Sequence, residues 1–95
     1  MPKAPLLDER EIGARLDTLA GWELDGKAIV KRLRFNDFGE AVRFVNQLVG
    51  PSDEQNHHPD VAIHWNELTI TLWTHASGGL TERDFRLAQT IDGLS

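Results

Sequence analysis

Three of the four histidines in this chain have the spacing of a shared chemical site. His57 and His58 are adjacent, and His75 follows within the same part of the chain. Imidazole has an unperturbed pKa of about 6.5, so it can both give and take a proton near neutral pH. General acid–base catalysis by such groups is worth roughly 10²- to 10⁴-fold in rate. We therefore predict an acid–base site here and expect His64, which stands apart, to be a solvated surface residue.

A predicted β-hairpin is what brings the histidines together. Strands over 61–65 and 68–75 flank Asn66-Glu67, and a two-residue turn there fixes the register. This register yields one continuous apolar face, in which Ile63 lies opposite Ile70 and Val61 lies opposite Leu72. Continuing the count places His58 opposite His75, roughly 5 Å away. Pro59 favours an extended conformation at His58, and Asp84 is expected near the same cleft.

Three helices are predicted from their starts. Each start is an acceptor side chain followed three residues later by an acid, as in a capping box: Asp8 and Glu11, Asp37 and Glu40, Thr81 and Asp84. The helices should cover 9–19, run onward from 38, and cover 82–92. Gly50-Pro51 predicts a kink or a restart in the second helix at Pro51. The residues expected to be buried are Ile12, Leu16 and Leu19, then Ala41, Val42, Val45, Leu48 and Val49, then Phe85, Ala88 and Ile91.

A further hairpin completes the predicted fold. Strands over 22–24 and 27–35 flank Asp25-Gly26, a strong two-residue turn signal. The order is then α-β-β-α-β-β-α in a single domain spanning 1–95. This is an α+β fold, a four-stranded antiparallel sheet with helices packed on one face, because that arrangement buries all the apolar stripes.

Composition excludes several classes of function. The net charge is −5, which disfavours binding to nucleic acid, and there is no cysteine for a disulfide or a thiolate metal site. No apolar run approaches the roughly 20 residues of a membrane helix, and MPKAPLLDER lacks the apolar stretch of a signal peptide. We expect a cytoplasmic protein that binds neither nucleic acid nor membrane.

The stretch from Asp53 to Asp84 resembles the signature of the pterin-4a-carbinolamine dehydratase family. That signature has an acid, three residues, His-His-Pro, five residues, an aromatic, nine residues, a histidine and then an aspartate. Every spacing is met, by Asp53, His57-His58-Pro59, Trp65, His75 and Asp84. The words NHHPDV, LTITLWTH and GGLTERDFRLA are also similar to the family's, and a weaker likeness extends through GWELDGKAIVKRLRFNDFGEAVRF.

The resemblance implies an activity and a set of roles. Members remove water from 4a-hydroxytetrahydrobiopterin to give quinonoid dihydropterin, with no metal or organic cofactor, and so recycle the pterin released by aromatic amino-acid hydroxylases. His57, His58 and His75 would be catalytic, with His57 and His75 as the acid–base pair. His58, Pro59, Trp65 and Asp84 would bind the pterin, and Asp53 would support the site. Family members form homodimers or homotetramers, a use that would suit Trp73 and the sheet edges.

Three alternatives stay open at this point. The histidines with Asp53, Asp60 and Asp84 could hold zinc or iron, although adjacent histidines point apart in an extended chain. The domain could instead be a non-catalytic binding module that stabilises a partner protein's dimer. A third alternative keeps the reaction but changes the physiological pterin to a molybdopterin-related or folate-like compound.

Overall fold

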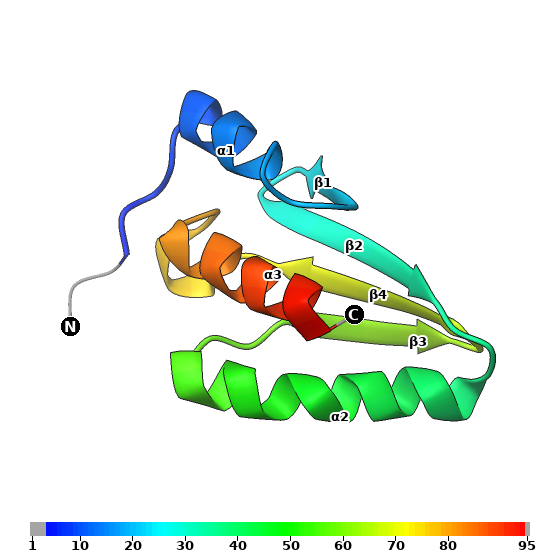
Figure 1. The fold of residues 1–95 in the computed structure, drawn as a ribbon. Coiled ribbons are helices and arrows are strands. Elements are labelled where there is room, and N and C mark those ends of the chain that lie inside the picture. Colours follow the sequence, from blue (N-terminus) through cyan, green and yellow to red (C-terminus); the bar gives the residue numbers. More distant parts are fainter. Residues whose placement is uncertain (1–3, 95) are drawn as a thin grey trace.

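The computed structural model describes residues 4–94 and confirms the predicted order of elements (Figure 1). Its regular elements are α1 (Glu9–Leu16), β1 (Trp22–Asp25), β2 (Ala28–Arg34), α2 (Phe38–Gln55), β3 (Asp60–His64), β4 (Glu67–Leu72), the short 3₁₀ helix η1 (His75–Ser77) and α3 (Glu82–Leu94). The four strands form one antiparallel sheet in the order β1-β2-β4-β3. All three helices lie on the same face of this sheet, as predicted.

The core lies between the sheet and the helices. Residues of β4 that point toward the helices are fully buried, and so are the inner residues of α3. The buried cluster consists of Trp22, Ile29, Phe44, Leu48, Leu68, Ile70, Leu72, Leu80, Phe85, Leu87, Ala88 and Ile91. Alternation along β4 produces this face, since every second residue of a strand points the same way. The core therefore fixes α3 directly over the end of β4.

Two of the helix starts behave as their sequences predict. The Asp8 side chain accepts from the Glu11 N–H at 2.8 Å, and the Glu11 carboxylate accepts from the Asp8 N–H at 3.2 Å, which completes a capping box. Asp37 accepts from the Glu40 backbone at 2.8 Å. α1 is shorter than predicted, because the chain turns at Thr18 and Leu19 through i→i−3 bonds. Ile12, Leu16 and Leu19 are only partly buried against the core.

α2 corrects two predictions. The helix continues through Gly50 and Pro51 to Gln55, so no new helix begins at Pro51. Leu48 and Ser52 are buried on either side of the proline. Their burial holds the helical turn around Pro51 against the core. The buried face also differs, since Phe44 is in the core, Val42 and Val45 are only partly buried, and Val49 is 55% exposed.

Both hairpin turns sit one residue away from their predicted positions. Asp25 pairs with Ala28, so the first turn is Gly26-Lys27, with Gly26 at φ +60°. In the second, His64 pairs with Glu67 and the turn is Trp65-Asn66.

The turn is set by Asn66. Its backbone oxygen accepts from the Phe35 N–H at 2.8 Å, and its side chain donates to the Phe35 carbonyl at 2.9 Å. Ile63 consequently lies opposite Leu68 and Val61 opposite Ile70, instead of Ile70 and Leu72. The partner of each β3 residue has therefore shifted by two positions along β4. Because alternate residues of a strand point to the same face, each side chain keeps its predicted face.

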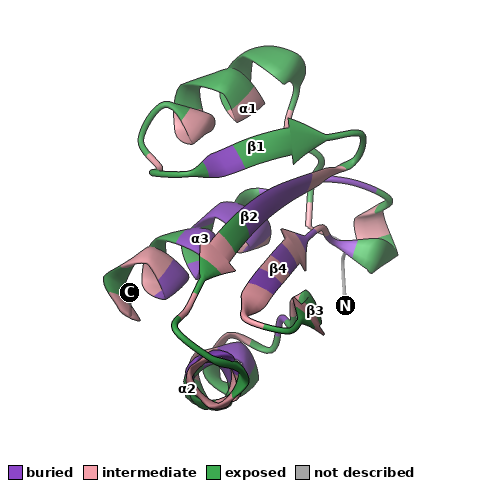
Figure 2. Cartoon of the chain, turned by 90° about the vertical axis from the view of Figure 1, so that its right-hand side faces the viewer, coloured by how far each residue is buried: buried purple, intermediate pink, exposed green. Residues whose placement is uncertain are grey.

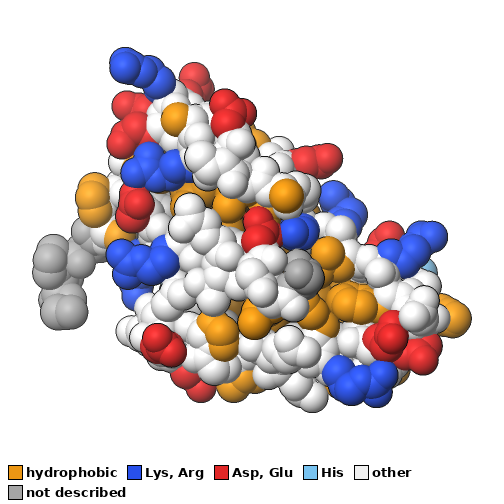
Figure 3. Space-filling view, viewed as in Figure 1, with side chains coloured by type: hydrophobic (Ala, Val, Ile, Leu, Met, Phe, Trp, Pro, Cys, Tyr) orange, Lys and Arg blue, Asp and Glu red, His pale blue; other side chains and the backbone are white. Residues whose placement is uncertain are grey.

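The outer surfaces differ in exposure. Figure 2 shows burial concentrated in the two central strands and on the inner sides of the helices, while the edge strands β1 and β3 are largely exposed. On the helix-covered face, charges of both signs are scattered, and apolar side chains reach the surface beside the C-terminal end of α3 (Figure 3). Among residues 4–94, no helix has the length and apolar character needed to cross a bilayer.

A partly buried ion pair ties the first hairpin to α3. Lys31 donates to the Asp92 carboxylate at 2.6 Å, and the Trp22 indole donates to the same oxygen at 2.9 Å. Lys31 is buried although it is charged, so its ammonium depends on Asp92 for compensation. The pair therefore locks β1 and β2 onto the last turns of the helix.

Replacing Asp92 with alanine should destabilise the fold by about 3 kcal/mol, because it leaves a buried ammonium without its counter-ion. Urea unfolding followed by circular dichroism measures the change. Glu23→Ala, at an exposed position of β1, is the matched control and should change stability by less than about 0.5 kcal/mol. Equal unfolding midpoints for the two variants would show that the Asp92 pair adds nothing.

Candidate active site

The three histidines lie at one end of the sheet, where β3 begins and β4 ends, but not in the predicted pairing. β3 starts only at Asp60, and β4 ends at Leu72. Thr74 forms an isolated bridge to Gly79, and His75 starts η1. The prediction that His58 lies opposite His75 is therefore wrong, since neither residue belongs to the ladder.

His57 is the buried member of the group. Its Nε2 lies 2.6 Å from Oδ1 of Asp84, whose side chain is completely buried. With Asp84 ionised, Nε2 carries the proton that it donates to the carboxylate. Nδ1 is then the ring nitrogen without a proton. A carboxylate in this position selects the tautomer of the histidine.

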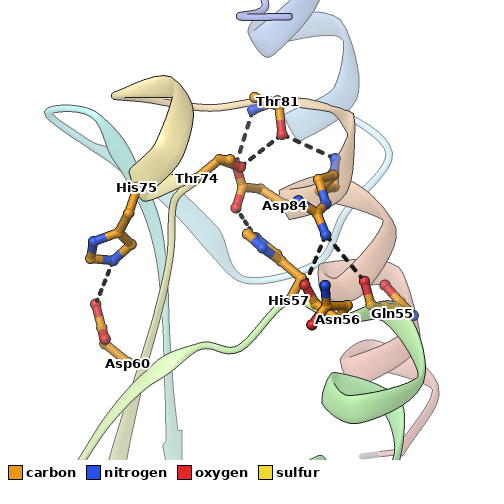
Figure 4. A network of polar contacts seen from close by, with 9 residues as sticks. Gln55, Asn56, His57, Asp60, Thr74, His75, Thr81 and Asp84 are labelled. Carbon is orange, nitrogen blue, oxygen red and sulfur yellow. Dashed lines mark hydrogen bonds and ion pairs between the residues drawn. The ribbon is translucent and has the colours of Figure 1, made fainter. Parts of the chain in front are cut away.

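A chain of hydroxyls orients the Asp84 carboxylate. Its Oδ2 accepts from the Thr81 backbone at 2.9 Å and from the Thr74 hydroxyl at 2.8 Å. The Thr74 hydroxyl donates its one proton to Asp84. In the 2.7 Å hydrogen bond between the two threonine hydroxyls, Thr81 must therefore be the donor. Thr81 Oγ1 in turn accepts from the Arg83 backbone at 3.2 Å. Every donor in the chain thus points toward the carboxylate that holds His57 (Figure 4).

The predicted capping box at Thr81 is therefore also part of the site. Asp84 is the third helical residue of α3, and its carboxylate accepts from the Thr81 backbone as a capping box requires. The Thr81 hydroxyl accepts from Arg83 rather than from Asp84. One oxygen of Asp84 accepts from the helix start and the other contacts His57, so the same carboxylate joins α3 to the histidine.

The backbone at the end of α2 aims His57 at this carboxylate. Asn56 caps α2 in the left-handed conformation, at φ 49° and ψ 45°, which reverses the chain. The His57 N–H then returns to the Ser52 carbonyl at 3.0 Å. The Arg83 guanidinium donates to the Asn56 carbonyl at 2.8 Å and so ties the same turn to α3. Asn is one of the few side chains that tolerate this conformation.

His75 has a different environment. Its ring packs against Trp73, with centroids 3.9 Å apart and ring planes tilted by 41°, and its Nε2 lies 3.8 Å from Oδ2 of Asp60. Both partners of this ion pair are about two-thirds exposed. Figure 4 shows the ring pointing away from Asp84, on the other side of the segment that carries Thr74. His57 and His75 therefore approach the end of the sheet from opposite sides.

His58 pairs with the supporting acid found in the sequence. Its Nε2 lies 2.9 Å from Oδ1 of Asp53, and both side chains are exposed. His58, Pro59 and Asp53 also line a mostly apolar pocket of about 160 Å³ between α2 and β3. Each of the three histidines thus has its own carboxylate, and the three pairs range from fully buried to solvated.

Trp65 is the one candidate that lies away from the rest. It follows His64 at the far end of β3, in the hairpin turn. Asp60, which contacts His75, is five residues earlier, and a strand rises about 3.3 Å per residue. Trp65 is therefore separated from the histidines by roughly 16 Å within one chain.

No set of three or more His, Cys, Asp or Glu side chains in the described part of the chain has the spacing to hold a metal ion. The carboxylates instead go one to each histidine. The sequence analysis missed Thr74 and Thr81 as residues that contact the site, and it named Asp60 only as a possible metal ligand. Asp60 directly follows the His-His-Pro run, and Thr74 alternates with Trp73 and His75, so strand alternation offered a signal for both.

Asp84→Asn should switch the tautomer of His57. The amide oxygen must face Thr74 and Thr81, both donors, so the amide NH₂ faces Nε2 and forces the ring proton to Nδ1. Imidazole ¹⁵N–¹H correlation spectra distinguish the two tautomers. Asp53→Asn, which touches only His58, is the control and should leave the His57 signals unchanged. An unchanged His57 tautomer in Asp84→Asn would refute the proposed polarity of the chain.

Comparisons with known proteins agree with this arrangement. A family model described as pterin 4 alpha carbinolamine dehydratase matches residues 5–94. A protein of Trichodesmium erythraeum, provisionally named a pterin-4-alpha-carbinolamine dehydratase, is 46% identical over 95% of this chain and 97% of its own.

Two solved structures are also similar. A transcriptional coactivator/pterin dehydratase from Brucella melitensis has a TM-score of 0.86 and 33% identity, covering 93% of this chain and 96% of that one. A pterin dehydratase-like protein described as a RuBisCO assembly factor in the alpha-carboxysome has a TM-score of 0.64 and 26% identity, covering 79% and 89%. On the match to the family model and to these relatives, the chain belongs to the pterin-4-alpha-carbinolamine dehydratase family.

Proposed function

We propose that this protein dehydrates 4a-hydroxytetrahydrobiopterin to quinonoid dihydropterin by histidine acid–base catalysis. The observation that carries the proposal is the buried His57–Asp84 pair, at 2.6 Å, in a chain that belongs to this family. A structural domain gains little from burying a histidine against a fully enclosed carboxylate. A catalyst gains a ring held in one tautomer and one orientation.

The reaction asks for two proton transfers. The C4a–O bond breaks and the departing hydroxide takes a proton, so that water leaves. N5 loses its proton, and its electron pair forms the N5=C4a double bond. One group must therefore donate and another must accept, and imidazole can do either near neutral pH.

The histidines take roles that their environments favour. His57 and His75 form the acid–base pair, because they approach the same end of the sheet from opposite sides and each has a carboxylate. His58 and Pro59 bind and orient the pterin beside the pocket that they line. Asp84 acts through His57, and Asp53 supports His58. The contact with Trp73 limits the orientations of the exposed His75 ring.

The wider setting is part of the same proposal. The pterin would come from an aromatic amino-acid hydroxylase, and the enzyme would serve tetrahydropterin recycling in the cytoplasm as a homo-oligomer. No metal or organic cofactor is invoked, since both proton transfers can be assigned to side chains of this chain.

A second candidate function is a binding role without turnover. The observation that favours it is the structural likeness to a protein described as a RuBisCO assembly factor. Such a module would not need the ordered hydroxyl chain behind Asp84. A partner protein recovered in stoichiometric amount with the wild-type chain, together with no acceleration of dehydration, would decide for this role.

Stopped-flow measurement of the dehydration of freshly generated 4a-hydroxytetrahydropterin tests the proposal. The wild type should accelerate it over the uncatalysed background. His57→Ala and His75→Ala should each lose up to about 10⁴-fold in kcat, because each removes one proton-transfer group. Arg86→Ala, at an exposed position of α3, is the control and should retain the wild-type rate.

Circular dichroism must show each variant folded for the comparison to count. Wild-type rates in both histidine variants would refute the acid–base pair. Loss in His75→Ala alone would leave His57 with a structural role, and the hydroxyl chain would then serve folding.

A further inference from the structure

We propose that the N-terminal segment, residues 4–7, is a positioning element for His75 that acts through the Ser77 hydroxyl. The inference deepens the proposed function and rests on it for the effect on turnover. It begins from a contrast between the two histidines assigned to proton transfer. His57 is held by a buried carboxylate, whereas the Asp60 carboxylate beside His75 is exposed and lies 3.8 Å away, too far for a hydrogen bond. The carboxylate alone therefore cannot fix the position of His75.

His75 lies in the loop that joins β4 to α3. It begins η1, which ends at Ser77, and the loop continues through Gly78 and Gly79. The base of the loop is closed, since the Thr74 N–H donates to the Gly79 carbonyl at 2.9 Å and the Gly79 N–H returns to the Thr74 carbonyl at 3.3 Å. Gly78 is at φ +76°, and two successive glycines leave the backbone beside η1 more freedom than other residues would. This single helical turn is held firmly only if another segment supports it.

The N-terminal segment provides this support. The Ser77 hydroxyl donates to the Ala4 carbonyl at 2.6 Å, and the bond is partly buried. The Leu7 N–H donates to the Leu80 carbonyl at 3.0 Å, directly before Thr81. In Figure 1 the segment runs from α1 along the side of the molecule where this loop lies. The two bonds therefore fasten η1 and the entry to α3 to the same short stretch of chain.

Gly79 allows the two segments to approach closely. A Cβ atom at this position would lie 3.1 Å from Cδ2 of Leu6, which is closer than ordinary van der Waals contact. Gly79 is buried, although Leu6 itself is 57% exposed. The N-terminal segment therefore packs directly against the backbone of the loop.

The supporting segment is anchored at its other end. Leu7 packs against the core, and the capping box at Asp8 starts α1 directly after it. Arg15, in the last turn of α1, forms an ion pair with Glu82 in the first turn of α3. Chain termini are usually poorly ordered unless they are tied down, and residues 5 and 6 are exposed. The bonds to the loop therefore place this terminus, and through it the loop is linked to α1 and the core.

The support acts on His75 and not on His57. Ser77 and His75 belong to the same helical turn, so a shift of η1 moves the imidazole directly. His57 comes from the end of α2, and its partner Asp84 is held by donors at the closed base of the loop. A misplacement of about 1 Å at a reacting group can cost on the order of 10²-fold in rate. Ser77 is thus a positioning residue that acts through His75.

The docking of the segment is tested first without reference to activity. Ser77→Ala removes the hydroxyl that donates to Ala4. Amide hydrogen exchange at Leu7 should become roughly threefold to tenfold faster, because its N–H is released whenever the segment leaves the loop and one neutral hydrogen bond has been lost. Thr18→Ala is the matched control, since it removes a 2.7 Å bond from a hydroxyl to a backbone carbonyl beyond the end of α1. It should leave the exchange at Leu7 unchanged.

Imidazole ¹⁵N–¹H correlation spectra supply a signature that a merely structural role would not produce. In Ser77→Ala the His75 signals, assigned by their absence from His75→Ala, should shift while the His57 signals stay in place. Ser77→Thr keeps a hydroxyl and should return the His75 signals to their wild-type positions. Circular dichroism confirms that each variant is folded.

The effect on turnover is measured by stopped-flow dehydration of 4a-hydroxytetrahydropterin. Ser77→Ala should lower kcat roughly threefold to tenfold and leave KM within about twofold, because one neutral hydrogen bond is lost and it lies away from the pterin-binding residues. Those residues, His58 and Pro59, line the pocket between α2 and β3. Ser77→Thr should restore kcat, and Thr18→Ala should retain the wild-type rate.

The outcomes separate this inference from the proposed function. Unchanged exchange at Leu7 in Ser77→Ala overturns the docking of the segment through this hydroxyl. Faster exchange with unmoved His75 signals, with equal shifts of His57 and His75, or with a wild-type kcat overturns the positioning role. A wild type that never accelerates dehydration refutes the proposed function, and the exchange and imidazole measurements then decide the positioning of His75 by themselves.

Discussion

The structure of the site depends on one buried carboxylate. Asp84 accepts hydrogen bonds from a helix start, from a threonine hydroxyl and from His57, which come from three separate segments. A completely enclosed charge is tolerable only when such donors surround it, because its desolvation is otherwise costly. The buried carboxylate therefore fixes the positions of all its donors, and His57 is one of them. Folding of this end of the sheet consequently also aligns the side chains of the site.

The three histidine–carboxylate pairs fall into two classes of burial. His57–Asp84 is enclosed, whereas the side chains of His75–Asp60 and His58–Asp53 are all exposed to solvent. A bond in a low-dielectric interior is electrostatically stronger and its geometry is more strictly maintained. The exposed pairs are worth little to stability and leave their rings free to adjust. The proposed dehydration, with its two proton transfers, would use one histidine held in a fixed position and one that can adjust.

Much of the fold was predictable from the sequence, because capping boxes, turn residues and alternation act locally. The box at Asp8 is seen directly, the cap at Asp37 is present although Glu40 accepts from Asn36 instead, and the predicted faces of the strands in the second hairpin were correct. The exact turn at Trp65-Asn66 was not predictable, since Asn66 bonds to Phe35 at the end of another strand. For the same reason, the pairing of His58 with His75 was wrong. The continuity of α2 through Pro51 likewise depends on burial on both sides of it, which is a tertiary effect.

The site residues show the same limit of what local sequence signals can predict. The spacing indicated which histidines belong together, but the carboxylate assigned to each depends on the ends of β3, β4 and α2. Thr74 and Thr81 have no chemical signature of their own. They matter because alternation and a helix start bring their hydroxyls within 2.7 Å of each other. The sequence could name the reactive groups, and only the fold could show what orients them.

The left-handed Asn56 has a consequence for how this chain can diverge. Reversal of the backbone at that point decides the direction in which His57 leaves α2, and Arg83 seals the turn through a backbone carbonyl that any residue would supply. The identity of the side chain at 56 is thus constrained by its dihedral angles and not by its chemistry. Glycine and asparagine can replace each other at this position, whereas valine or isoleucine would be strained by its left-handed dihedral angles. A substitution at position 56 could therefore misdirect His57 without changing any of the side chains that contact it.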